Sequence, residues 1–197
     1  PEFTSALGDP ETSQGGHPNV HYTVGSAGVV LEVDKETGKL TVLKAALAVD
    51  VGQVINPELV KGQIVGGILQ GLATALYEDI RYAPDGRLLN PNFTDYKIPT
   101  TLDCPLEIVP IMLETPQPDG PFGARGVGEH TMIAAAPNIA DAIEDAVGVR
   151  LKTMPLTAEK VALALHGIEY DDVKGDNLGF CFRGRPCDYP FDTGGAS

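Results

Sequence analysis

The sequence predicts an α+β domain in which a mixed, largely antiparallel sheet, led by a β-hairpin, packs against helices. Residues 21–34 and 40–52 alternate and are rich in β-branched side chains, with the turn "KETGK" between them, which is the pattern of two hairpin strands. After residue 56 the spacing of apolar residues changes to four, the period of a helix. Strands followed by helices, without βαβ alternation, indicate the α+β class.

The first predicted helix follows the hairpin. Pro57 suits the first helical position, Asn56 is a suitable cap, and Glu58 lies in the first turn. Its apolar positions recur every four residues: Val60, Ile64, Ile68, Leu72 and Leu76. It also contains four glycines: Gly62, Gly66, Gly67 and Gly71. Each costs about 1 kcal/mol relative to alanine, so we expect another backbone or a ligand to approach this helix closely.

The remaining elements are shorter. Asp85-Gly86 predicts a turn, and residues 106–114 predict a strand that Pro110 places at a sheet edge. A second helix is expected from His130 or Thr131 to Val147, with Pro137 as a kink or a new helix start. Residues 149–155 are a candidate last strand. A third helix is expected within 157–167, capped by Thr157 and closed by Gly167.

Composition divides the chain into three parts. Residues 1–19 are polar and rich in Gly, Pro and Ser, which is typical of a flexible lead-in or of an expression remnant. Residues 20–168 hold all the periodic segments and form the expected domain. Residues 169–197 have no periodicity and are expected to be an irregular tail.

Charge and cysteine content exclude several classes. A formal charge of −13 and a pI near 4.5 argue against nucleic-acid binding, which needs a basic surface. No signal peptide and no apolar run of the length of a membrane span are evident, so a cytoplasmic location is expected. Cys181 and Cys187 are close enough in sequence to pair, but reduced thiols are the more common state. The four histidines show no metal-ligand spacing.

Glu129 is the first candidate catalytic residue, because it ends the glycine-rich run "GARGVGE". Backbone N–H groups of such a loop at a helix start can receive an anion while the carboxylate acts as a general base. Alternatively, Glu129 caps the second helix or interacts with its dipole. Composition leaves both interpretations open.

Other polar residues have similar alternatives. Gln63 and Gln70 are two helical turns apart and can face the same side, either to bind a heterocycle or simply to face solvent. Asp50 and Asn56 fit structural roles at a strand end and a helix start. His130 follows Glu129, but adjacent residues on a helix do not face each other. No nucleophile motif is present, and Cys104 lies in a Pro-flanked loop without an evident base.

Three separated stretches together resemble a known family. They are "VDVGQVINPELVKGQIVGGILQGLATALYEDI", "FTDYKIPTTLDCP" and "GARGVGEHTMIAAAPNIADAIEDAVGVRLKTMPLTAEKV". In this order they resemble the C-terminal part of the large, molybdenum-binding subunit of molybdenum hydroxylases, the xanthine dehydrogenase and aldehyde oxidase family. The resemblance runs from about His21 to Leu165.

The resemblance implies a role for each matched position. Glu129 aligns with the catalytic glutamate, which deprotonates a molybdenum-bound hydroxide while hydride passes to the sulfido ligand. Gln63 aligns with a glutamine that hydrogen-bonds the molybdopterin. The other cofactor-binding positions that it implies are Gly62, Gly126, Val127 and Gly128. The chain itself supplies no metal ligand in this scheme.

The resemblance also sets expectations for the whole enzyme. It would oxidise an aldehyde or an N-heterocycle, with iron–sulfur clusters and FAD on other domains or subunits, and the full enzyme would be a dimer. The earlier glycine-rich cofactor segments are absent, and "AVDVG" lacks the His that many bacterial members carry before the Asp. An isolated chain is therefore expected to be inactive. The alternatives are carbon monoxide dehydrogenase, an aromatic-thioester dehydroxylase, or a non-catalytic interaction or assembly domain of this fold.

Overall fold

A computed structural model describes residues 22–168, 180–181 and 185–186 of the chain. The strands are β1 (Gly25–Val33), β2 (Leu40–Asp50) and β3 (Glu107–Leu113), with the short β4 (Phe180–Cys181) and β5 (Arg185–Pro186) pairing separately. The α-helices are α1 (Pro57–Leu76), α2 (Ala135–Val147) and α3 (Ala158–Leu165), and the 3-10 turns are η1 (Pro121–Gly123) and η2 (Glu129–Met132). Residues 1–19, Cys187 and most of the predicted tail lie outside the described residues, so the flexible lead-in and the two alternatives for Cys181 and Cys187 stay predictions.

The main sheet has the order β1-β2-β3. β1 and β2 form the predicted antiparallel hairpin, in register from Gly25↔Val49 to Val33↔Leu40 with one irregularity after Val30. β3 pairs with β2 in parallel, so this sheet is mixed, with one pairing of each kind. β3 lies at an edge of the sheet, as Pro110 indicated.

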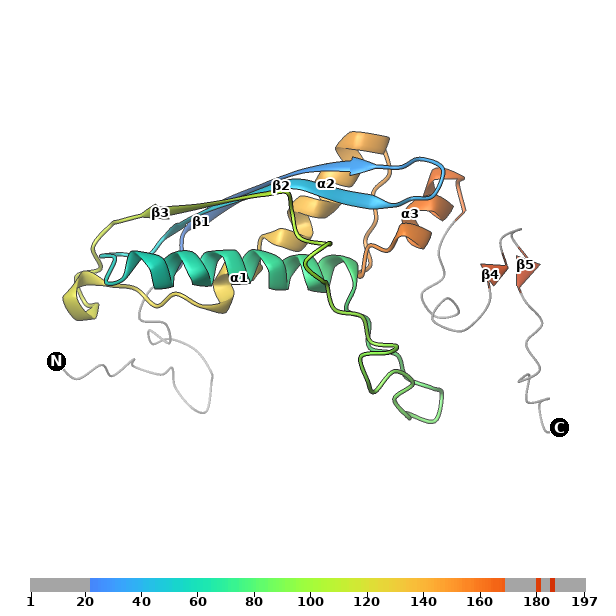
Figure 1. Ribbon diagram of the computed structural model, residues 1–197, viewed down its shortest axis with the longest axis horizontal. Helices are drawn as coiled ribbons and strands as arrows, with labels where there is room; N and C mark the ends of the chain where they lie inside the picture. Colours follow the sequence, from blue (N-terminus) through green and yellow to red (C-terminus); the bar gives the residue numbers. More distant parts are fainter. Residues whose placement is uncertain (1–21, 169–179, 182–184, 187–197) are drawn as a thin grey trace, which may run out of the picture.

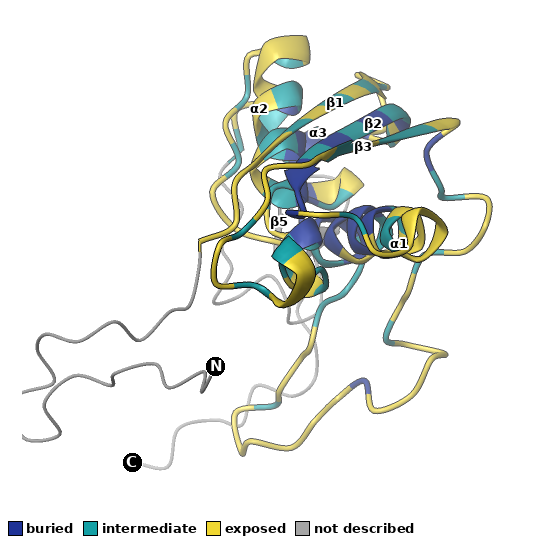
Figure 2. Cartoon of the chain, turned by 90° about the vertical axis from the view of Figure 1, so that its left-hand side faces the viewer, coloured by how far each residue is buried: buried dark blue, intermediate teal, exposed yellow. Residues whose placement is uncertain are grey.

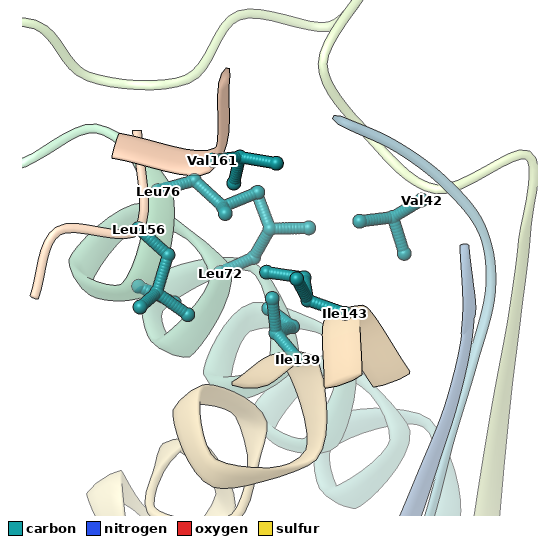
Figure 3. Packing of buried hydrophobic residues seen from close by; sticks show 8 residues of the cluster. Val42, Leu72, Leu76, Ile139, Ile143, Leu156 and Val161 are labelled. Atoms are coloured by element: carbon teal, nitrogen blue, oxygen red, sulfur yellow. The ribbon is translucent and has the colours of Figure 1, made fainter. Parts of the chain in front are cut away.

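The helices supply the core on one face of this sheet. α1 runs along the sheet while α2 lies against β1, and the buried side of α1 faces the strands (Figures 1 and 2). One buried cluster joins β2, α1, α2 and α3 around Leu72, Ile139 and Val161 (Figure 3). A second joins β2 to the first half of α1 around Val49 and Ile64. The predicted α+β class is therefore confirmed.

α1 begins as predicted. The side-chain oxygen of Asn56 accepts a hydrogen bond from the N–H of Leu59 at 3.1 Å, and Pro57 is the first helical residue. By length and composition alone, with a mean hydropathy of 1.3, α1 would be apolar enough to cross a membrane. This window corrects the expectation that the chain has no apolar run of the length of a membrane span. The apolarity has a structural explanation, because eight residues of α1 are buried against the sheet, α2 and η2.

The expectation of one helix from residue 130 to Val147 is wrong in its first part. Glu129–Met132 form a separate 3-10 turn, and α2 starts only at Ala135. The break allows Met132 and Ala135 to lie against Gly71 of α1. Pro137 falls in the first turn of α2, where N–H groups lack intrahelical acceptors, so it neither kinks nor starts the helix.

The expected last strand, 149–155, is also wrong. This segment has no strand pairing. Arg150 instead forms ion pairs with Asp141 and Glu144 of α2, and the N–H of Leu156 donates to the carbonyl oxygen of Ala75 at 2.6 Å. The segment is thus held against helices, and α3 follows with Thr157 as its cap, as predicted.

Residues 78–104 form an excursion that projects from the body (Figures 1 and 2). Asn90 is buried within it, donating to the carbonyl oxygen of Asp79 at 2.6 Å and accepting from the N–H of Arg81 at 2.9 Å. Asp85-Gly86 forms the predicted turn, closed by a bridge between Tyr82 and Leu88. The excursion has its own hydrogen bonds but no helix or strand that packs on the core.

Candidate functional site

Glu129 is exposed at the first position of η2, where the glycine-rich loop ends. η2 is a single 3-10 turn, and its own N-terminal flank, Gly128, supplies no side-chain cap. α2 starts later, after Ala134, so Glu129 does not cap the second helix. The capping interpretation therefore loses its structural basis, and the carboxylate remains available to a ligand.

Thr131 fastens this turn to α1. Its buried hydroxyl lies 2.7 Å from the carbonyl oxygen of Gly128 and 3.2 Å from that of Gln63. A Cβ on Gly67 would lie 1.8 Å from the Thr131 hydroxyl oxygen, and one on Gly71 would lie 2.5 Å from the Cβ of Ala135. These two glycines therefore permit the close approach that brings the Glu129 turn alongside Gln63.

Four other glycines have no such internal explanation. A Cβ on Gly62, Gly66, Gly126 or Gly128 would meet no atom within 4 Å. None has a positive φ, so backbone conformation does not require glycine at these positions. Two lie within α1, where each costs about 1 kcal/mol relative to alanine. The space beside these four glycines is open, so it has room for a ligand or for a segment outside the described residues.

Gln63 and Gln70 of α1 are both exposed, which is compatible with either of their predicted roles. Gln63 also lines a groove of about 290 Å³ with Gln53, Asn56 and Arg125. Val127 lines the same groove, but it is half-buried and also packs against the core cluster around Ile64. Amide donors and acceptors beside bare backbone suit a flat, polar heterocycle, so these residues fit a pterin.

Asp50 and Arg125 form a buried ion pair whose role the sequence did not reveal. The Nη2 of Arg125 lies 3.7 Å from the Oδ2 of Asp50, and their side chains are only 12% and 10% exposed. Burial by itself raises the pKa of Asp50, but hydrogen bonds from Gly52 and Thr115, with the charge of Arg125, lower it overall. Two features of the sequence could have indicated this ion pair: an acid at the end of a strand, and an arginine between small residues in the glycine-rich loop. Asn56, the other residue of that stretch, has the structural capping role that the sequence suggested.

His130 and Glu129 lie in different surroundings, since His130 is half-buried and Glu129 is exposed. Within the described part of the chain, no group of three or more His, Cys, Asp or Glu side chains could hold a metal ion.

Known proteins identify the family of this chain. The sequence model of the molybdopterin cofactor-binding domain family matches residues 2–105, more than half of the chain. The chain belongs to this family. The matched residues include Gln63 and Gly62, whereas the loop that carries Glu129 follows them.

Curated relatives of this molybdopterin cofactor-binding domain are parts of larger assemblies by name. The 6-hydroxypseudooxynicotine dehydrogenase complex subunit gamma of Paenarthrobacter nicotinovorans is 36% identical over 76% of this chain and 19% of its own length. The carbon monoxide dehydrogenase large chain of Afipia carboxidovorans is 33% identical over 66% of this chain and 16% of its own. The chain thus spans about a fifth of the length of the curated relatives that it matches.

Solved structures support the same membership. Quinoline 2-oxidoreductase from Pseudomonas putida 86 superposes with a TM-score of 0.69 at 36% identity, over 74% of this chain and 19% of that one. The aldehyde oxidoreductase of Desulfovibrio desulfuricans gives a TM-score of 0.70 at 37% identity, over 76% of this chain and 16% of that one. The family resemblance seen in the sequence is confirmed.

Proposed function

We propose that this chain forms one wall of the molybdopterin site of a molybdenum-dependent hydroxylase or dehydrogenase, with Glu129 as its general base. The supporting observation is the turn of Glu129, which Thr131 fastens alongside Gln63 while the neighbouring glycines leave space unfilled. Family membership supports the cofactor class.

Each residue has a distinct task in this proposal. When bound, the molybdenum–molybdopterin group supplies two-electron redox chemistry. An Oε atom of Glu129 takes the proton from a water-derived nucleophile. The amide of Gln63 orients the pterin by hydrogen bonds, and Gly62, Gly126, Val127 and Gly128 let it approach their backbone.

The proposed substrate is an aldehyde or an N-heterocycle. The printed names of the quinoline and aldehyde oxidoreductases support this class. Carbon monoxide is the alternative that the large chain of carbon monoxide dehydrogenase favours. In this proposal, segments outside this chain select among these substrates.

The proposed partners are the remainder of the molybdenum-binding subunit and the iron–sulfur and flavin domains or subunits that carry electrons away. The names of relatives, a complex subunit and a large chain, support this arrangement. A dimeric complete enzyme in the cytoplasm is part of the same proposal.

Replacing Glu129 by Gln in the complete enzyme tests the base assignment. The amide keeps the size of the side chain but does not accept the proton, so kcat should fall by about 10²–10⁴-fold, the usual contribution of general-base catalysis. Molybdenum content, measured by mass spectrometry, should stay unchanged. Steady-state turnover with an aldehyde and with an N-heterocycle gives the rate.

Glu36→Gln is the matched control, because Glu36 is exposed in the β1–β2 turn, away from the site. Wild-type turnover by Glu129→Gln would disprove the base assignment. An enzyme that purifies with its partners but without molybdenum would instead favour the non-catalytic assembly domain.

A further inference from the structure

Arg125 lies in the glycine-rich loop that follows η1, beside the residues just after β2. Its backbone N–H donates to the carbonyl oxygen of Val51 at 2.9 Å, and its Nη1 donates to that of Tyr22 at 3.1 Å. Its Nη2 faces Asp50, and its buried Nε has no hydrogen-bond partner among the described residues. The guanidinium is thus held inside the protein, with Asp50 as its paired carboxylate.

Asp50 connects three segments through its two carboxylate oxygens. Its Oδ1 accepts from the N–H of Gly52 at 3.0 Å and from the N–H of Thr115, just beyond β3, at 3.1 Å. The other oxygen faces Arg125. Since the pair is largely removed from water, loss of either partner would leave an uncompensated buried charge.

The backbone around this pair is closely packed. Gly52 has a φ of +64°, and a Cβ there would lie 2.4 Å from the carbonyl oxygen of Gly123. That same oxygen accepts the N–H of Gln53 at 2.8 Å. The loop is therefore fixed to the end of β2 at residues 123–125.

The other end of the loop is fixed to α1 by Thr131 of η2, whose hydroxyl donates to the carbonyl oxygen of Gln63. Between the two anchors lies the segment 126–130, which holds Glu129 and two glycines with no neighbour near their Cβ positions. Val127 of this segment also packs against the cluster around Ile64, but the glycines on either side of it leave the backbone free to adopt many conformations. The position of the carboxylate therefore depends on the two anchors as well.

We propose that Arg125 is a positioning residue for Glu129, and that its ion pair with Asp50 fixes the upstream anchor of the catalytic loop. This inference rests on the proposed function, in which Glu129 is the base. A displacement of about 1 Å at a reacting group can cost about 10²-fold in rate. A guanidinium without contact to the reacting atoms can therefore control turnover.

Arg125→Met in the complete enzyme tests the inference, with Arg150→Met as the control. Arg150 is exposed and pairs with Asp141 and Glu144 of α2. We expect kcat to fall by about 10²-fold for Arg125→Met while KM changes less than about two-fold. Amide hydrogen exchange in 126–131 should accelerate, and that in α2 should not. Arg150→Met should leave turnover and loop exchange unchanged.

Three further variants extend the test, and the first two keep it decisive if Arg125→Met folds poorly. Arg125→Lys retains the charge and should recover part of the turnover. Asp50→Asn retains an acceptor for the N–H groups of Gly52 and Thr115 but removes the ion pair, so it should reproduce the loss. The double variant Asp50→Asn/Arg125→Met should be no slower than either single one, because one interaction is removed.

Two results would overturn the inference. One is unchanged amide hydrogen exchange in 126–131 in both Arg125→Met and Asp50→Asn. The other is faster amide exchange that is spread equally over α1 and α2. This readout does not depend on catalysis. If Glu129→Gln were fully active while Arg125→Met still loosened 126–131, the proposed base would be wrong and the anchor would stand.

Discussion

At the scale of single residues, Tyr77 and Asp103 tie the excursion back to the body. The Tyr77 hydroxyl, at the end of α1, donates to the Oδ1 of Asp103 at 3.1 Å. Asp103 also accepts from the N–H and the hydroxyl of Thr100, each at 2.7 Å. Burial first, and then the negative charge of Asp103, raise the pKa of Tyr77 to about 12.

This pKa predicts a loss of stability in alkali. The neutral phenol is favoured in the folded protein, so the stabilisation is complete below the unfolded pKa of about 10 and is lost as pH rises toward about 12. The hydrogen bond to Glu78 also raises the pKa of Tyr96, so phenolate absorbance should show more than one late tyrosine, and Tyr77→Phe should remove the step near pH 12. Tyr82→Phe, at an exposed position, is the control. A step near pH 12 that keeps its full amplitude in Tyr77→Phe would contradict the assignment.

Sequence motifs identified Glu129 and Gln63 but not the residues that hold them. Both lie within recognisable stretches, and both are exposed. Thr131 and Arg125 act through contacts with Gln63, Asp50 and Tyr22, distant in sequence, and those contacts exist only after folding. A single sequence carries no local signal for such pairings, so their roles required the structure.

At the scale of the element, the glycines of α1 divide into two kinds. Gly67 and Gly71 contact η2 and the start of α2, whereas Gly62 and Gly66 face open space. The sequence predicted that a close approach compensates for glycine in this helix. The structure confirms it for the first pair and leaves the second pair for a ligand or another segment.

Neighbouring substitutions in α1 separate these two effects. The methyl group added by Gly66→Ala would meet no atom within 4 Å. This substitution should stabilise the isolated chain by about 0.5–1 kcal/mol, because alanine favours the helix. Gly67→Ala would overlap the Thr131 hydroxyl and should destabilise it by about 1–3 kcal/mol. Urea unfolding followed by circular dichroism measures both. Equal effects of the two substitutions would refute the packing argument.

Local signals predicted some elements well and others poorly. The hairpin, the cap at Asn56 and the cap at Thr157 follow from adjacent residues, and all are present. The parallel placement of β3 beside β2 and the break between η2 and α2 depend on partners far along the chain. Residues 149–155 have a strand-like composition, but they pack on helices instead.

At the scale of the whole molecule, the proposed function makes the chain one side of a site. Glu129 and Gln63 are both exposed, and the space beside Gly62, Gly66, Gly126 and Gly128 has no opposite wall among the described residues. The excursion also exposes large apolar side chains, with Phe93 75% and Leu102 94% exposed. Both features are expected of a chain that spans about a fifth of the length of its relatives.

Cofactor retention should therefore require more than this chain. Sites that hold small molecules tightly bury about 70–90% of the ligand surface, and a one-sided wall buries far less. We expect the purified 197-residue chain to contain less than about a tenth of an equivalent of molybdenum, since the lost burial weakens binding steeply. The complete subunit, prepared from the same cells, should approach one equivalent. Stoichiometric molybdenum on the isolated chain would show that its single wall is sufficient.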